Sequence, residues 1–270
     1  WYHLRVTVGG EPLPLGRGSF PVHVRAGPPS AGTSRLLDVP LLSAHAWPVG
    51  RRLTIYAQLH DRFGNRCARG GELLRVSGCA EPAEALAVPH RAGERAGGLP
   101  RGPGLGVLDR GDGSFEIAIS PRRSGPQALS VTLADGGHVS GSPLALTVVP
   151  GTIAPERCVA EGEGLRHAEA MRPAAFRVRM RDGCGNAVPS VADPQSPTGE
   201  PLPLRLQLTP GLKGQRTAVE DAGGGEFVLR YTVPISGRYQ LAVLLGHERR
   251  NIQGSPFTVT VGNATETPLC

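Results

Sequence analysis

The sequence is poor in several residue types, and these shortages count against whole classes of function. Its 270 residues include only two Trp, four Tyr and six Phe, and the basic residues are Arg except for Lys213. Nucleic-acid binders gather their positive charge on one face and stack bases on aromatic rings. Here the arginines are scattered along the chain, although the net charge is +6. We therefore expect no nucleic-acid partner.

Long apolar runs and catalytic motifs are also missing. No run approaches the roughly 18 apolar residues of a membrane-spanning helix, so we expect no membrane span within these residues. There is no nucleophile elbow, zinc-protease helix motif, P-loop or paired Cys-x-x-Cys, and the eight His are scattered. Asp109, Asp112 and Asp135 lie in or near turns, but without the oxygen spacing of a calcium loop. We expect no catalytic residue, no cofactor and no metal site, and hence no enzyme.

Gly and Pro are abundant, and the residues between them alternate. The chain contains 38 Gly and 26 Pro. Leu53, Ile55 and Ala57 alternate with more polar residues, and so do Phe115 and Ile117. A period of two places one face of a strand on a core and the other in water. About seven such strands in roughly 100 residues, with turns between them, indicate an all-β sandwich of two sheets.

Several phrases recur in a fixed order. Gly-Ser-Phe-Pro, Gly-Ser-Pro and Gly-Ser-Pro each open an alternating strand, at residues 18, 141 and 254. "DRFGN" at 61–65 matches "DGCGN" at 182–186, and "GDGSFEIAI" at 111–119 matches "GGGEFVLRY" at 223–231. The repeat predicts a terminal fragment at 1–28, complete domains at 29–150 and 151–262, and a tail or linker at 263–270. Residues 80–104 lack steady periodicity and are expected to form a loop inserted in the first complete domain.

Taken together and in order, these motifs resemble the filamin-type immunoglobulin-like repeat. The resemblance implies tandem immunoglobulin-like β-sandwiches of about seven strands each, which act as spacers, force-bearing links and peptide-docking modules. Docking by such modules adds an extended peptide to an open sheet edge. The resemblance places that edge near Leu73 and Arg75 in one domain and near Leu204 and Leu206 in the next. A scaffold or cross-linker with cytoskeletal or receptor-tail partners is the first interpretation.

An extracellular adhesion protein, for example one for gamete attachment, is the alternative, because filamin-like repeats also occur on plant and algal gametes. The resemblance places Cys158 and Cys184 at neighbouring strand ends, where either a disulfide or free thiols would fit. Asn263 begins an N-glycosylation triplet. The sequence leaves open whether the location is the cytoplasm and cytoskeleton or the cell surface. A repeat module of a ubiquitin-ligase-type protein is a third interpretation.

A short motif adds a further open question. Arg110, Gly111 and Asp112 spell the tripeptide that binds integrins in animal adhesion proteins, but they also form the expected turn before a repeat strand. The same position in the next domain has no Arg. A chance match and a functional motif both remain open on the sequence.

Overall fold

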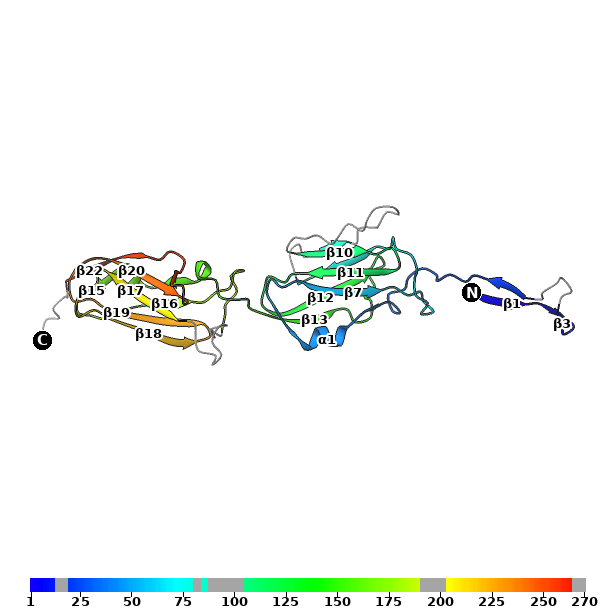
Figure 1. Cartoon of the computed structure of the whole chain (residues 1–270), viewed down its shortest axis with the longest axis horizontal. Coiled ribbons are helices and arrows are strands. Elements are labelled where there is room, and N and C mark those ends of the chain that lie inside the picture. Colours follow the sequence, from blue (N-terminus) through cyan, green and yellow to red (C-terminus); the bar gives the residue numbers. More distant parts are fainter. Residues whose placement is uncertain (13–18, 80–83, 87–103, 190–202, 264–270) are drawn as a thin grey trace. The chain divides into compact units, whose positions relative to one another are not determined.

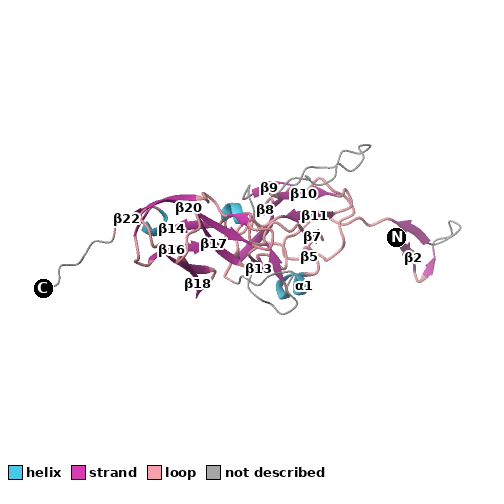
Figure 2. Ribbon diagram, turned by 60° about the vertical axis from the view of Figure 1, so that its left-hand side comes forward, coloured by secondary structure: helices cyan, strands magenta, loops and turns pink. Residues whose placement is uncertain are grey.

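The computed structural model describes residues 1–12, 19–79, 84–86, 104–189 and 203–263. Strands dominate in the described residues, so the all-β expectation is confirmed (Figures 1 and 2). None of the described helices is both long enough and apolar enough to cross a membrane. The chain forms two compact units. The first comprises Trp1–Ala46, Arg52–Pro121 and Pro126–Thr147, and the second comprises Trp47–Arg51, Arg122–Gly125 and Val148–Cys270.

The first unit contains a terminal hairpin and a sandwich. The hairpin elements are β1 (Tyr2–Arg5), β2 (Thr7–Val8), β3 (Glu11–Pro12) and β4 (Ser19–Val22). The first elements of the sandwich are β5 (Arg35–Leu36), α1 (Val39–Ala44), β6 (Ala46–Pro48), β7 (Leu53–Gln58) and β8 (Leu74–Ser77). They are followed by β9 (Glu84–Leu86), β10 (Leu105–Asp109), β11 (Ser114–Ile119), β12 (Gly125–Leu133) and β13 (Leu144–Val149). The sheet orders are β10-β11-β7-β5 and β6-β13-β12-β8-β9.

The second unit repeats this plan with fewer additions. Its elements are η1 (Pro155–Arg157), β14 (Val159–Glu161), η2 (Glu163–Leu165), β15 (His167–Glu169) and β16 (Ala174–Arg179). They are followed by β17 (Leu204–Thr209), β18 (Arg216–Gly223), β19 (Glu226–Thr232), β20 (Gly237–Leu245), β21 (Arg250–Asn251) and β22 (Phe257–Gly262). One sheet has the order β14-β16-β19-β18 and the other β15-β22-β20-β17, with β21 also paired to β20.

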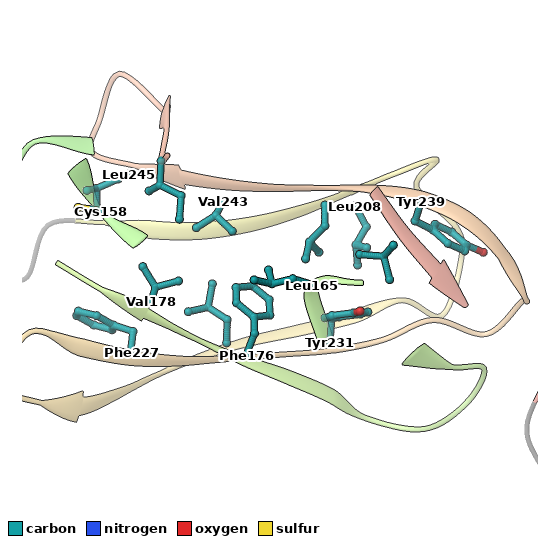
Figure 3. Close-up of a cluster of buried hydrophobic side chains, with 14 of the residues drawn as sticks. Cys158, Leu165, Phe176, Val178, Leu208, Phe227, Tyr231, Tyr239, Val243 and Leu245 are labelled. Carbon is teal, nitrogen blue, oxygen red and sulfur yellow. The ribbon is translucent and has the colours of Figure 1, made fainter. Parts of the chain in front are cut away.

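Alternating apolar side chains fill the space between the two sheets, as the sequence pattern predicted. Figure 3 shows this core in the second unit, with side chains of one sheet facing those of the other. The facing sets are Phe176, Val178, Phe227 and Tyr231 against Leu208, Tyr239, Val243 and Leu245. Near the start of β20, the Tyr239 hydroxyl donates to the carbonyl oxygen of Ile235 at 2.8 Å. A tyrosine bonded to backbone a few residues upstream is a hallmark of immunoglobulin-like sandwiches.

The repeated Gly-Ser-Pro phrase has a specific structural role. The Ser142 hydroxyl oxygen accepts the backbone N–H of Val131 at 2.8 Å, and Ser255 accepts that of Val243 at 2.9 Å. These bonds join the phrase to the preceding strand, β12 in the first unit and β20 in the second. Each serine therefore satisfies a backbone donor near the point where the strand leaves regular pairing.

The Asp-x-x-Gly-Asn turns hold the chain that enters each sandwich. Asp61 accepts the backbone N–H of Gly27, and Asp182 accepts that of Gly151, both at 2.9 Å. The Asn65 side chain, followed by the Gly27 N–H, lowers the pKa of Asp61 to about 2. Burial would raise the pKa of Asp182, but hydrogen bonds from Gly151 and Asn186 outweigh it and lower that pKa too. Both carboxylates therefore stay charged at neutral pH and keep accepting these hydrogen bonds.

The glycine before β19 is expected to be one of the least replaceable residues in the second unit. Gly225 and Gly224 both have positive φ, but only a Cβ at Gly225 would collide with the carbonyl oxygen of Val188. Gly224→Ala should lower the free energy of unfolding by about 1–2 kcal/mol, the cost of left-handed backbone. Gly225→Ala adds the collision and should lower it by about 3 kcal/mol or more. Urea unfolding of the two variants measures the difference, and equal losses would contradict the assigned collision.

Candidate protein-docking edge

Strand β17 forms the open edge of its sheet. It is the last strand in the order β15-β22-β20-β17, and no described strand pairs with its outer side. It pairs antiparallel with β20 over six residues, from Leu204 opposite Leu245 to Thr209 opposite Gln240. An exposed edge of this length carries unpaired N–H and C=O groups, which is the template that an added strand requires.

The backbone groups that face outward can be assigned residue by residue. Leu206 lies opposite Val243. The Val243 N–H donates to Ser255 and its C=O accepts from Ile252, so both groups point away from β17. Opposed residues in an antiparallel pair are either both bonded to each other or both turned away. The N–H and C=O of Leu206 therefore face outward, and those of Leu204 and Leu208 follow by alternation.

The side chains along this edge combine an apolar base with a polar rim. Leu204 and Leu206 are half-buried and pack against the core, and Leu208 is buried. Arg205, Gln207 and Thr209 alternate with them and are exposed. Strand β18 of the other sheet lies close to β17. The exposed Val219 adds an apolar side chain on β18, next to Glu220, which pairs with Arg230 at 3.7 Å. An added strand would find backbone bonds on β17 and an apolar contact between the two strands.

The equivalent edge in the first unit is closed, which corrects the expectation for that domain. Strand β9 pairs antiparallel with β8 and continues the sheet beyond it. Of the two predicted residues, Leu73 lies just before β8, and Arg75 lies opposite Thr132 of β12. By the alternation used for β17, the outward backbone groups of β8 belong to Leu74 and Val76. The expectation of a loop failed at Glu84–Leu86, and residues 80–83 and 87–103 lie outside the described residues.

The cysteines and Asn263 are placed as follows. Cys158 is a free thiol in the core, 3.7 Å from the sulfur of Met180, and Cys184 is a free thiol in an exposed turn. The sequence left open a disulfide between Cys158 and Cys184. It is not formed, because the Cys158 sulfur points into the core. Burial raises the pKa of Cys158, which keeps its thiol protonated and unreactive. Asn263 is exposed directly after β22, as a glycosylation site requires.

The Arg-Gly-Asp tripeptide forms the turn between β10 and β11, and both charged side chains have partners there. Arg110 pairs with Glu116 at 2.7 Å and lies over the ring of Tyr56. Asp112 pairs with Arg66 at 3.0 Å and accepts from the backbone of Ser114. A partner that bound both groups would have to displace these contacts. Within the described part of the chain, no cluster of three metal-ligating side chains is found.

Comparisons with known proteins agree with this architecture. Residues 152–258 match the model of the filamin family, described as the Filamin/ABP280 repeat. Residues 152–258 are a filamin-type repeat. Filamin-C of Rattus norvegicus is 24% identical over 273 residues, which are 96% of this chain and 8% of that protein. The chain thus spans less than a tenth of this relative. The E3 ubiquitin-protein ligase TRIM45 of Bos taurus is 32% identical over 110 residues, 40% of this chain and 17% of that protein.

Two solved structures are similar at low identity. The Lin-41 filamin domain has 19% identity and a TM-score of 0.33, and the match covers 41% of this chain and 97% of that one. The adhesin FdeC of Escherichia coli has 16% identity and a TM-score of 0.44, and the match covers 88% of this chain and 67% of that one. Both TM-scores are low, so the fold described above rests on the strand order and pairing of this chain.

Amide hydrogen exchange should show the open edge directly. The N–H groups of Leu204, Leu206 and Leu208 should exchange with solvent at least tenfold faster than those of Arg205 and Gln207, which face β20. The interleaved residues serve as internal controls, because they share the same strand and local stability. Nuclear magnetic resonance of the 270-residue chain measures each rate. Uniform protection along β17 would mean that the edge is covered.

Proposed function

We propose that this protein is a non-enzymatic binding module that docks an extended peptide segment onto the outer edge of β17. The observation that supports this most strongly is the row of outward backbone groups on Leu204, Leu206 and Leu208, which no described strand pairs. Strand addition would satisfy those groups with partner backbone. The filamin-type repeat at 152–258 supports the same coarse role in protein binding.

The edge selects for a particular kind of segment. Half of the side chains of an added strand would point to the apolar base formed by Leu204, Leu206 and Val219, and the other half would face water. We therefore propose a segment with apolar or β-branched residues at alternating positions. The rim carries both signs of charge, from Arg205 and Arg216 and from Glu220 and Asp221. This mixture favours a segment of low net charge.

The scaffold or cross-linker role belongs to this proposal. Such a role requires at least two binding elements in one protein, and the chain supplies one open edge in its second unit. Cytoskeletal proteins and receptor tails are the proposed partners, because extended segments in such proteins offer the backbone that the edge lacks. The similarity to Filamin-C over 96% of the chain supports this proposal.

The experiment is a peptide selection with a backbone-specific variant. A phage-displayed library of random 12-residue peptides is panned against the 270-residue chain, and the enriched peptides are then tested on Leu206→Pro. Proline at an edge position removes an outward N–H while leaving the pairing with β20 intact. We expect enriched peptides with alternating apolar residues, and at least a tenfold loss of affinity for Leu206→Pro, measured by calorimetry.

A matched variant separates lost binding from lost folding. Gln207→Pro removes an N–H that faces β20 and should destabilise the second unit by about 3 kcal/mol. Leu206→Pro should retain cooperative unfolding with a much smaller loss. Peptides that bind wild type and a folded Leu206→Pro with equal affinity would overturn the proposed edge.

A cell-surface adhesion role is a second candidate, and the exposed Asn263 favours it. A glycan there would place the module in the secretory pathway, where the edge could dock a partner at the cell surface. Intact mass of the protein from its native host, before and after glycosidase, tests this. We expect a glycan mass loss that Asn263→Gln abolishes. Unmodified Asn263 would contradict the adhesion candidate.

A further inference from the structure

Strand β9 occupies, in the first unit, the position at which the second unit is open. It pairs with β8 through Arg75 opposite Leu86, Val76 opposite Ala85 and Ser77 opposite Glu84. It also lies close to β10 of the other sheet. In the second unit, β17 is the counterpart of β8 and β18 is the counterpart of β10. These two strands lie close to each other, and no described strand pairs with the outer side of β17. The added strand thus lies where a partner strand would lie.

The equivalence of the two edges extends to single residues. Val76 lies opposite Val131, whose N–H donates to Ser142, just as Leu206 lies opposite Val243, whose N–H donates to Ser255. The Val131 C=O accepts from Val139, so both backbone groups of Val131 face away from β8. Val76 therefore turns its own N–H and C=O toward Ala85. Val76 thus has the same place in its sheet as Leu206 has in the sheet of the second unit.

Within the described residues, β9 is attached to β8 through three residue pairs. By the alternation of antiparallel strands, the closed, doubly bonded pair among these three is Val76 with Ala85. By contrast, β8 pairs with β12 over four residues, and the side chains of Leu74 and Val76 are fully buried in the core. The sandwich therefore places β8 without help from β9. Losing β9 would uncover backbone and leave the packed face in place.

We propose that β9 is an intrachain substitute for a partner strand, and that an extended peptide can replace it on β8. The first unit then holds a second docking edge that is closed until β9 leaves. This inference rests on the strand-addition chemistry proposed for β17, but it concerns a different edge and different residues. It also predicts the chemistry of the segment that fits: the sequence of β9 itself.

The test weakens the pairing of β9 by mutation and supplies the β9 sequence as a separate peptide. Ala85→Pro removes the N–H of the closed pair, and Leu86→Pro is the matched control, because the Leu86 N–H points away from β8 by the same alternation. The probe is a synthetic peptide, PAEALAV, that copies residues 82–88, added at millimolar concentration to the isotope-labelled 270-residue chain. We expect the Val76 amide to exchange at least tenfold faster in Ala85→Pro than in wild type or Leu86→Pro. The peptide should shift the amides of Leu74 and Val76 in Ala85→Pro, and slow their exchange, far more than in wild type.

Amides elsewhere in the same chain serve as controls for each outcome. Continued protection of Val131, bonded to Ser142, shows that the first unit remains folded. If Ala85→Pro unfolds it, Ala85→Gly replaces that variant, because glycine keeps the N–H but weakens the strand. Unchanged exchange at Val76, or peptide shifts that are absent or equal in variant and wild type, would overturn the proposal. Shifts confined to Leu204, Leu206 and Leu208 would refute the role of β9 while leaving the β17 edge supported. Shifts at Leu74 and Val76 alone would support β9 without supporting β17.

Discussion

In each unit, the hydrogen bond from a valine N–H to the hydroxyl of the Gly-Ser-Pro serine fixes which backbone groups of one strand face its neighbour. It turns Val131 and Val243 toward their serines, at 2.8 and 2.9 Å. Because backbone groups alternate along a strand, this choice also decides which groups of the neighbouring strand face outward. The outward groups of Leu206 and Val76 are thus determined by a contact on the far side of another strand. The repeated phrase therefore fixes the outward groups of the edge strand without touching that strand.

The two units share the same sandwich and differ at one sheet edge. Both have the Gly-Ser-Pro serine, the aspartate that holds the entering chain, and a glycine whose Cβ would meet a backbone carbonyl. These shared features satisfy buried backbone groups and define turns, so they specify the fold. The differences lie where backbone is left without a partner. One unit adds β9 to its outer strand, and in the other no described strand pairs with the outer side of β17, so the two copies of one fold differ at this edge.

The sequence predicted the fold well, because alternation and turn chemistry act locally. The strands around Ile55 and Phe115 followed from a period of two. The family resemblance pointed to Leu204 and Leu206, which lie on β17, a strand whose outer side no described strand covers. The prediction in the first unit failed because β9 is three residues long and lies in a segment without periodicity. Whether such a strand pairs depends on the vacant edge of β8, which is a property of the assembled sheet. The placement of Arg75 failed for a related reason. A shift of one residue along a strand exchanges its two sets of backbone groups, and composition carries no record of that register.

The aspartates of the Asp-x-x-Gly-Asn turns have a mechanical consequence. Asp61 holds Gly27 and Asp182 holds Gly151, and each glycine lies in the segment that leads into its sandwich. Tension applied along that segment reaches the carboxylate, and the turn behind it, before it reaches the first sheet strand. A charged oxygen bonded to several donors yields less readily than a single neutral bond. In each unit, the first contact to bear such a pull is therefore a charge-assisted hydrogen bond and not a pair of sheet strands.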